Sequence, residues 1–587
     1  MKKSIFRVMT FSLAVILFIS LTACHQVKQE SMPEPTDRSL DINAIADQYV
    51  VNLFKFNPEM STFNQVEHPD NVNLTDISPA GLERMEAAED ALYEKLKAVE
   101  YAQLDKNQQI TYQLLNSQIS GSIKSRICNR HLWSMNHLDA FYTWYRYIGQ
   151  TQPVGDAAAR SNALARWAKI PEYIRNDLAN NRKGLAMGYA LPRVVVEKVI
   201  AQMDQLLATP VEDNVFYMPA MRDTDVTFQN QMKEHIESRI MPEIKKYRVF
   251  MQDEYLEKAR AELSITALPD GEACYAALLS ASTTLSNTPA EVYAWGEAAI
   301  AEREAMIKSL GAELYGTGDL SEIKSAFTSD KNNYFSTKAE ILTAAQAAID
   351  LAKVKSRDYF NLYPKSDVVL EPVPEIEEKT GYSRYLSASD DGSRPATYMQ
   401  ATYPPEKQVK GNIISTAYHE TYPGHHLQIA ISRELVKSHP VTKYLGNSGF
   451  SEGWARYSES LADEIGLYAS ASQRIAMYMG LPTGMVVDPG IHFNNWTREE
   501  AIKYTLSKQT AMTREDAERY VDRISVWPGQ MTTYGVGERF FINLRRQAER
   551  QLGDGFDIKA FHDACLKNGS VPLDYISEQV TAYINSQ

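Results

Sequence analysis

The sequence predicts a mainly α-helical protein with a small β element, and three observations lead to this class. Apolar residues recur at helical intervals through most of the chain after residue 40. Helix-start signals, in which Ser or Thr precedes Pro or stands three residues before an acidic residue, recur along it. Extended, alternating patterns are concentrated between residues 367 and 403. No internal repeat with a period of 20 to 50 residues is evident.

The chain begins with the pattern of a bacterial lipoprotein signal peptide. Met1-Lys2-Lys3 and Arg7 form a basic start, residues 8–19 are apolar, and Leu21-Thr22-Ala23-Cys24 is a cleavage site ending in Cys. Acyl chains on Cys24, palmitate among them, would anchor the protein in the cell envelope, and His25 in place of Asp favours the inner leaflet of the outer membrane, facing the periplasm. Three segments are expected: a signal peptide (1–23), a flexible tether (24–40) and a helical domain (41–587).

Helical signals follow one another from residue 41 onward. Periodicity favours helices over 41–56, 80–100, 106–128, 157–180, 190–208, 226–264, 337–355 and 556–566. Ser78-Pro79 starts one helix, and Thr288-Pro289 starts another that Gly311 is expected to close. Capping boxes begin two later helices: Thr497 with Glu500, and Thr513 with Asp516.

The strand signal lies in Asp367–Pro374 and Arg394–Tyr403, around the turn residues Asp391-Gly392-Ser393. Both segments precede a histidine-rich run. An edge strand at this place could pair with the backbone of a peptide substrate, or the segments could form a small structural hairpin.

The strongest functional signal is the run His419-Glu420-Thr421-Tyr422-Pro423-Gly424-His425-His426, followed by Glu452. Two imidazoles and a downstream carboxylate provide three ligands for zinc with an open position for water, and Glu420 provides a general base. Isolated histidines usually lie in cores or on helix surfaces, but here three of the chain's eleven fall within eight residues. The run therefore predicts a hydrolytic centre with one Zn²⁺ per chain.

The spacing of the ligands departs from the usual H-E-x-x-H, in which the two histidines stand about 6 Å apart along one helix. Here the candidates lie six and seven residues after His419. Pro423 lacks an amide hydrogen and Gly424 adopts almost any conformation, so a local bulge is expected. A bulge of two residues makes His425 the second ligand, and one of three residues makes it His426. We predict His425.

Composition limits the other functions. The formal net charge is −13, and loss of the signal peptide removes three positive charges, so a nucleic-acid partner is not expected. Beyond Cys24 only three cysteines remain, so at most one disulfide can form: Cys128, Cys274 and Cys565. A length of 587 residues suggests more than one lobe.

Several motifs resemble the bacterial lipoprotein family catalogued as domain of unknown function 885. They are the HETYPGHH run, SEGWARYSE around Glu452, Thr288–Tyr293, Asp391–Pro395, Asp488–His492 leading into Trp496–Ala501, and Trp527–Gln530 leading to Tyr534. The resemblance implies a zincin-like helical fold with two lobes around a deep groove, similar to thimet oligopeptidase, angiotensin-converting enzyme and carboxypeptidase Taq. The Glu-Gly-Trp-Ala run also resembles the third-ligand helix of gluzincin aminopeptidases, which gives Glu452 the ligand role.

Three further residues are candidates for supporting roles in such a groove. Tyr534 or His492 could donate a hydrogen bond to the oxyanion, although a tyrosine near a Pro-Gly turn is often a packed core residue. Glu459 lies one heptad after Glu452, so it could orient a ligating histidine, or it could be a solvated charge.

The expected function is a membrane-anchored zinc peptidase acting on short, unstructured peptides. Two alternatives stay open at this point: an envelope binding or assembly lipoprotein that keeps the scaffold without turnover, and a zinc amidase or esterase. The first is favoured because a non-catalytic protein has no chemical need for Glu420 beside His419.

Overall fold

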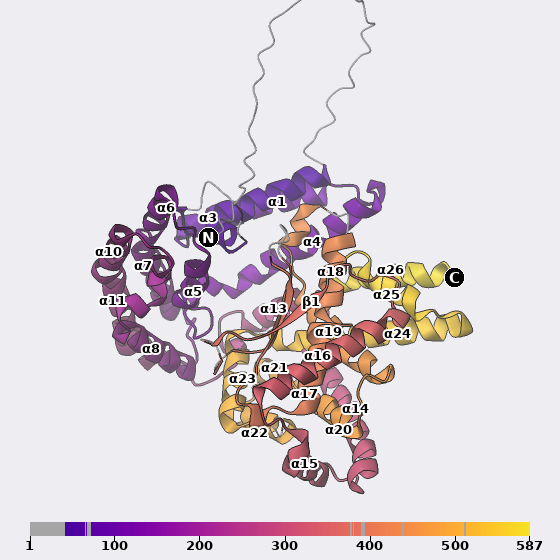
Figure 1. Ribbon diagram of the computed structural model, residues 1–587. Helices are drawn as coiled ribbons and strands as arrows, with labels where there is room; N and C mark the ends of the chain where they lie inside the picture. Colours follow the sequence, from indigo (N-terminus) through magenta and orange to yellow (C-terminus); the bar gives the residue numbers. More distant parts are fainter. Residues whose placement is uncertain are drawn as a thin grey trace, which may run out of the picture. The chain divides into compact units, whose positions relative to one another are not determined.

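Helices carry nearly all the regular structure of the computed structural model, which describes residues 41–64, 66, 72–375, 378–379, 381–388, 394–435, 439–509 and 512–587. Figure 1 shows these helices with one small group of strands among them. The prediction of a mainly α fold is confirmed. The predicted signal peptide, lipidation site Cys24 and tether lie outside the described residues, and so does the predicted turn at Asp391-Gly392-Ser393.

The first helices begin where the sequence places their caps. The Asp41 side chain accepts from the amide of Asn43, and that of Ser78 accepts from the amide of Gly81. The helices are α1 (Ile42–Phe56), α2 (Pro58–Phe63), α3 (Pro79–Lys97) and α4 (Lys106–Ser125). The predictions for these segments are confirmed to within a few residues at each end.

The next group of helices follows between residues 141 and 283. Its members are α5 (Phe141–Thr151), α6 (Ala157–Trp167), α7 (Ile170–Ala186), α8 (Arg193–Ala208), α9 (Met218–Met221), α10 (Val226–His235), α11 (Met241–Phe250), α12 (Leu256–Lys258) and α13 (Gly271–Thr283). The single helix predicted over 157–180 is wrong. The chain leaves the helix after Trp167, and α7 restarts with Pro171 in its first turn, where a missing amide hydrogen is tolerated.

One disulfide, Cys128–Cys274, joins the segment after α4 to α13, and Cys565 is a buried free thiol. This agrees with the expectation that at most one disulfide can form.

A long helix, α14 (Pro289–Tyr315), begins with the predicted cap Thr288 and is followed by α15 (Leu320–Ser329) and α16 (Lys338–Lys355). The predicted end at Gly311 is wrong, because α14 continues to Gly316, which has φ +73°. A Cβ at Gly311 would lie 2.2 Å from Ile323 Cδ1, so this glycine allows α15 to pack closely.

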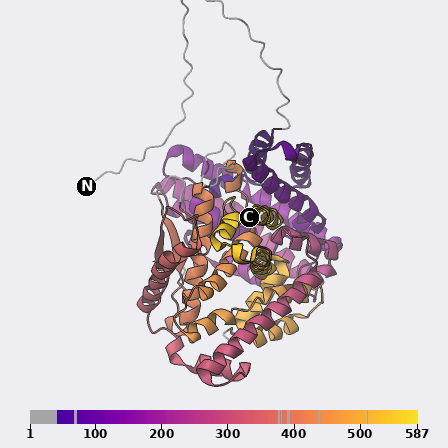
Figure 2. The same ribbon diagram turned by 90° about the vertical axis from the view of Figure 1, so that its right-hand side faces the viewer.

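The strands form a three-stranded sheet in the order β1-β3-β2, from β1 (Val368–Pro372), β2 (Arg384–Leu386) and β3 (Ala396–Gln400). β1 pairs with β3 in parallel and β2 pairs with β3 antiparallel. The two predicted strands are confirmed, but they are parallel, so they do not form a hairpin with each other. β1 packs beside α16, as the turned view of Figure 2 also shows.

The remaining helices complete the domain. They are α17 (Lys410–Glu420), α18 (His425–Leu435), α19 (Ser448–Glu464), α20 (Ala471–Met479), α21 (Gly484–His492), α22 (Arg498–Lys508), α23 (Arg514–Val526), α24 (Thr533–Leu552), α25 (Ile558–Leu566) and α26 (Leu573–Asn585). Both predicted capping boxes, at the starts of α22 and α23, are confirmed. α19 and α24 approach so closely that a Cβ at Gly453 would lie 2.4 Å from Gly537 Cα.

Two large hydrophobic clusters lie within the described domain, which forms one compact unit. One gathers side chains from α16–α19 and α24–α26, and the other from α5–α11 and α13. The division into two lobes around a deep groove stays a prediction. No helix in the described part of the chain combines enough length with enough apolar character to cross a membrane.

Candidate metal centre

The histidine-rich run forms the end of one helix and the start of the next. α17 ends at Glu420, Thr421 leaves the helical region with φ −121° and ψ −101°, and α18 begins at His425. The amide of Gly424 donates to the carbonyl of Tyr418, and a Cβ at Gly424 would lie 1.9 Å from the carbonyl oxygen of His419. Instead of the predicted bulge, the chain makes a complete break between two helices, which only glycine at position 424 permits.

The linking segment is fixed to α19, the helix that carries Glu452. The carbonyl of Pro423 accepts hydrogen bonds from the indole of Trp454 at 3.0 Å and from the hydroxyl of Ser458 at 3.1 Å. Both donors are fully buried. These bonds place the end of α17 and the start of α18 against the same face of α19.

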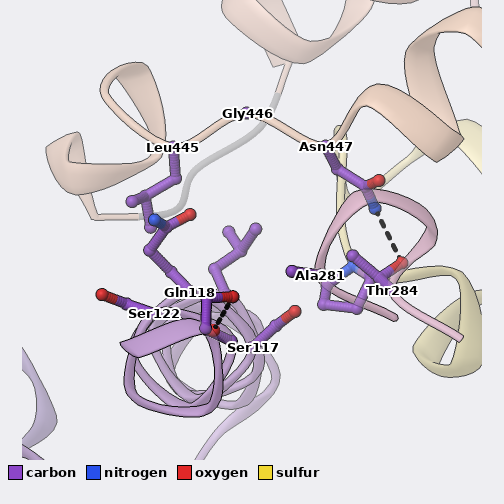
Figure 3. A pocket seen from close by; sticks show the side chains of 12 residues that line it. Ser117, Gln118, Ser122, Ala281, Thr284, Leu445, Gly446 and Asn447 are labelled. Carbon is purple, nitrogen blue, oxygen red and sulfur yellow. Dashed lines mark hydrogen bonds between the residues drawn. The ribbon is translucent and has the colours of Figure 1, made fainter. Parts of the chain in front are cut away.

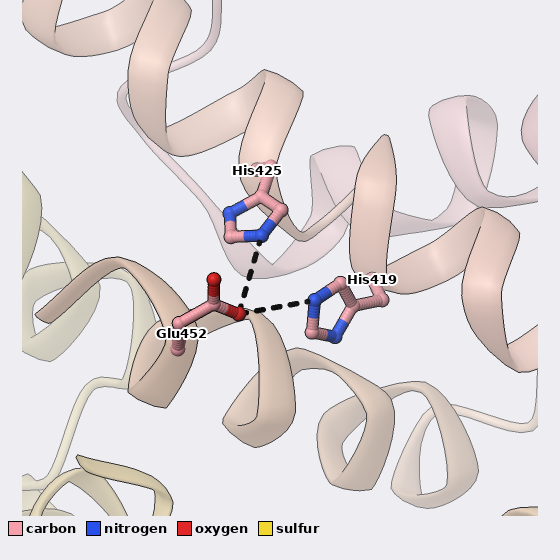
Figure 4. Close-up of side chains that lie close together, drawn as sticks. All are labelled: His419, His425 and Glu452. Atoms are coloured by element: carbon pink, nitrogen blue, oxygen red, sulfur yellow. Dashed lines mark ion pairs between the residues drawn. The ribbon is translucent and has the colours of Figure 1, made fainter. Parts of the chain in front are cut away.

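Three predicted ligands converge at this junction, as Figure 4 shows. Glu452 Oε2 lies 3.6 Å from His419 Nε2 and 3.7 Å from His425 Nε2, and the ligand atoms of all three lie within 4.8 Å of one another. A tetrahedral zinc site separates its ligand atoms by about 3.4 Å. The two separations from Glu452 are close to this value, so a zinc ion would fit once the two imidazoles adjust toward each other.

His426 points into a different environment. Its Nδ1 lies 3.1 Å from the hydroxyl of Tyr385, and its Nε2 lies 3.2 Å from the carbonyl of Ser366 and 3.1 Å from the hydroxyl of Tyr422. Burial lowers the pKa of His426 to about 4. Of the two alternatives for the second ligand, the geometry favours His425.

The Nδ1 side of the His419 ring, which faces away from Glu452, contacts a network of polar and charged side chains. Glu459 Oε1 accepts from His419 Nδ1 at 2.9 Å, and the same carboxylate accepts from Ser415 and from Arg456. Burial alone would lower the pKa of His419, but Glu452 and Glu459 outweigh it and raise this pKa to about 10. The predicted contact of Glu459 with His419, a candidate ligand, is confirmed, and it leaves Nε2 facing Glu452.

Glu420 lies next to the three converging side chains. It is 8% exposed, and burial raises the pKa of its carboxyl group. The backbone amide of Tyr385, in the edge strand β2, donates to this carboxyl group. The small sheet therefore lies beside the centre, as predicted.

Glu420, His419 and Tyr534 line one cavity of about 400 Å³. Burial, followed by the negative charge of Glu452, raises the pKa of the Tyr534 hydroxyl. Arg456 and Glu459 lie on another part of the wall. The cavity thus holds a carboxyl group able to take a proton and a protonated phenol able to donate a hydrogen bond.

The prediction that His492 could stabilise an oxyanion is wrong. His492 is fully buried, its Nδ1 accepts from the amide of Ile265 at 3.0 Å, and its Nε2 donates to the carbonyl of Ile524 at 3.0 Å. Both ring nitrogens are therefore used inside the core, and burial lowers the pKa of His492 to about 3.

Sequence reasoning missed Tyr385 and Arg456. Arg456 lies four residues after Glu452 and three before Glu459, so helical spacing alone could have placed it beside both. Tyr385 reaches the site through the antiparallel pairing of β2 with β3. No local sequence pattern predicts which residues of β3 pair with those of β2.

A second cavity differs from the one beside Glu420 because its wall contains no ionisable side chain. It measures about 300 Å³ and is lined by residues of α4 and α13 and of the segment before α19. In Figure 3 the amide of Asn447 faces the hydroxyl of Thr284, which accepts its hydrogen bond at 3.3 Å. This wall offers no acid, base or strong metal ligand.

Comparisons with known proteins agree with the resemblance drawn from the motifs. A family model described as bacterial protein of unknown function, DUF885, matches residues 58–580. The chain belongs to the DUF885 family. No curated protein sequence matches it significantly.

Solved structures show the fold of this DUF885 protein in other bacteria. The "putative lipoprotein" from Colwellia psychrerythraea aligns with a TM-score of 0.84 at 22% identity, covering 94% of this chain and 100% of that one. A protein from Shewanella oneidensis, with the same description and the words "of unknown function", aligns with a TM-score of 0.77 at 19% identity, covering 92% and 99% of the two chains. At these identities the likeness shows the fold alone.

Proposed function

We propose that this DUF885 protein is a zinc-dependent peptidase that hydrolyses short peptides. The observation that carries the proposal is the convergence of His419, His425 and Glu452 beside a cavity that also holds Glu420 and Tyr534. Three neutral or anionic ligands, a buried carboxyl group and a phenol are the groups that metal-assisted amide hydrolysis requires.

A zinc ion bound by these three side chains would polarise the scissile carbonyl and lower the pKa of a bound water. Glu420 takes a proton from the attacking water and gives it to the amine nitrogen as the carbon–nitrogen bond breaks. Its raised pKa suits both transfers. Tyr534 donates a hydrogen bond to the carbonyl oxygen as negative charge develops there. Glu459 accepts a hydrogen bond from Nδ1 of His419, which leaves Nε2 of this histidine for a zinc ion that would bind there.

The dimensions of the cavity favour short, unfolded substrates. A volume of about 400 Å³ accommodates a few residues of peptide but no folded domain. The edge strand β2 lies beside Glu420, where an extended peptide could align with it. These features support the zincin-like mode of action that the motifs suggest.

We further propose that acyl chains on Cys24 anchor the protein in the envelope, at the inner leaflet of the outer membrane. The signal-peptide pattern supports this location, and so does the description of two structural neighbours as lipoproteins. The Cys128–Cys274 disulfide adds support, because such bonds persist in oxidising compartments such as the periplasm.

A peptide-library digest tests the proposed reaction. The full chain, purified in detergent and loaded with zinc, is incubated with a mixed library of short peptides, and new termini are identified by mass spectrometry. Cleavage that disappears after chelation and returns with zinc supports a metallopeptidase. Stoichiometric zinc binding without cleavage of any peptide would favour an amidase, an esterase or a binding protein instead.

A further inference from the structure

Arg523, on α23, lies beside the side chains of Gln530 and Trp527. Its Nη2 donates to Gln530 Oε1 at 2.9 Å, and its guanidinium carbon lies 5.2 Å from the centroid of the Trp527 ring. Its Nε is buried and has no hydrogen-bond partner. Among the described residues, no Asp or Glu forms an ion pair with it. A guanidinium in this state still has donors for an anion.

This guanidinium lies next to the metal-centre cavity. The hydroxyl of Tyr534, which lines the cavity together with Glu420, interacts with both Gln530 and Arg523. The same hydroxyl is close enough to Glu452 for that carboxylate to raise its pKa. Arg523 therefore stands on the Tyr534 side of the cavity, just beyond the predicted oxyanion donor.

Two arginines near the centre, Arg456 and Arg303, have anionic partners. Arg456 pairs with Glu459 at 2.8 Å, and Arg303 pairs with Glu538. On α23 itself, Arg519 pairs with Glu515 and Asp516 on an exposed face. Arg523 differs from these three arginines because, among the described residues, no carboxylate forms an ion pair with it.

Three carboxyl groups lie in or beside the cavity wall, those of Glu420, Glu452 and Glu459, and Arg456 in the same wall already pairs with Glu459. An anionic group of a substrate can approach only where a cation compensates. Trp527 stacks against the guanidinium, and its indole Nε1 donates to Asp139 Oδ2 at 2.6 Å, so the ring that orients Arg523 is itself held in place.

We propose that Arg523, with Gln530 beside it, binds the C-terminal carboxylate of the peptide substrate, which leaves the hydroxyl of Tyr534 free to donate to the oxyanion. The inference rests on the proposed peptidase function and makes the enzyme selective for peptides with a free C-terminus. A guanidinium donates two parallel hydrogen bonds to a carboxylate, and these bonds fix the peptide in direction as well as in place. The carbonyl of a nearby peptide bond then lies between Glu420 and Tyr534.

The test compares one cleaved peptide as the free acid and as the C-terminal amide. The zinc-loaded wild type should prefer the acid by about 10- to 100-fold in kcat/KM, the effect expected for a charge-assisted hydrogen bond. R523Q should reduce kcat/KM for the acid by about the same factor, mainly through KM, and bring the acid-to-amide ratio close to one. R523K keeps the positive charge but cannot donate two parallel hydrogen bonds, so it should retain part of the preference for the free acid over the amide.

R519Q is the matched control, because it removes an exposed arginine from the same helix and should leave the ratio unchanged. Circular dichroism and zinc content establish that each variant is folded and loaded. Equal cleavage of acid and amide by the wild type would overturn the inference. A loss of equal size on both substrates in R523Q would also overturn it, since Arg523 would then act through Tyr534.

Binding to zinc-loaded E420Q separates this inference from the proposed function. Calorimetry with the acid and amide forms of the same peptide should show tighter binding of the acid by about 10- to 100-fold. Equal affinities would refute the carboxylate site even if peptides are cleaved. Tighter binding of the acid to an enzyme whose wild type cleaves no peptide would refute the peptidase while the carboxylate site stands.

Discussion

Two groups of largely enclosed histidines differ in the partners that their ring nitrogens meet. At the candidate metal centre, His419 and His425 direct Nε2 at the carboxylate of Glu452. In the cores, His492 and His562 bond to backbone carbonyls or amides and to a tyrosine hydroxyl, and burial lowers the pKa of each to about 3. Both groups lie mostly out of solvent, although the side chain of His419 is 14% exposed. Converging carboxylates are what distinguish a candidate ligand from a structural histidine.

The largest expected effect is a loss of peptide turnover on substitution of Glu420, beside the candidate metal centre. Glu420→Gln keeps the size of the side chain but removes its ability to accept a proton, so peptide turnover should fall by about 10² to 10⁴. Zinc content should stay at the wild-type level, because Glu420 is not a ligand. Rates are measured on a peptide from the library digest with zinc-matched samples. Turnover within threefold of wild type would remove Glu420 from the mechanism.

The adjacent pair His425 and His426 provides the most direct test of the comparison. Structural zinc sites with four ligands contribute about 10–16 kcal/mol, or about 3 kcal/mol for each ligand. His425→Ala should therefore weaken zinc binding by about 10² or more, and His426→Ala should weaken it much less. Competition with a chromophoric chelator gives both affinities. The reverse order would assign the ligand role to His426 and contradict the geometry of the site.

A smaller effect is expected from the carboxylate behind His419. Glu459→Gln can still accept a hydrogen bond from Nδ1, but it loses the charge that strengthens the histidine as a ligand. Zinc affinity should fall by about 10- to 100-fold, as is typical for such supporting carboxylates. Glu464→Gln, at an exposed position of the same helix, is the control. Unchanged affinity in Glu459→Gln would make Glu459 a packing residue only.

The smallest effect concerns the neutral histidines and depends on pH. The pKa of His492 is about 3 in the folded protein and about 6.5 when unfolded, so its neutral form is favoured by folding. The contribution of His492 to the free energy of unfolding is therefore constant above about pH 6.5. As the pH falls below this value, the free energy of unfolding decreases by about 1.4 kcal/mol per pH unit. His492→Gln should reduce this slope by that amount between pH 6 and pH 4, measured by denaturant unfolding, with zinc binding at pH 7 retained. An unchanged slope would show that His492 is charged in the folded protein.

Local sequence rules predicted the parts of the site that lie within one helix or one turn. Pro423 and Gly424 indicated the interruption that selects His425, and heptad spacing from Glu452 indicated Glu459. The misjudged His492 and the overlooked Tyr385 and Arg523 share another cause. Their roles depend on which distant element each side chain meets: Ile265 and Ile524 for His492, Glu420 for Tyr385, and Tyr534 for Arg523. Periodicity contains no information about such contacts.

The contact of Gly453 with Gly537 fixes the distance between α19 and α24 at the candidate metal centre. The two helices that meet there carry Glu452 on one side and Tyr534 on the other, and no space remains for even one methyl group between them. Any side chain at Gly453 or Gly537 would push the two helices apart. Glu452, the proposed third ligand, would then move away from the hydroxyl of Tyr534. An attempt to widen the range of substrates of the proposed peptidase would therefore have to begin with that helix pair.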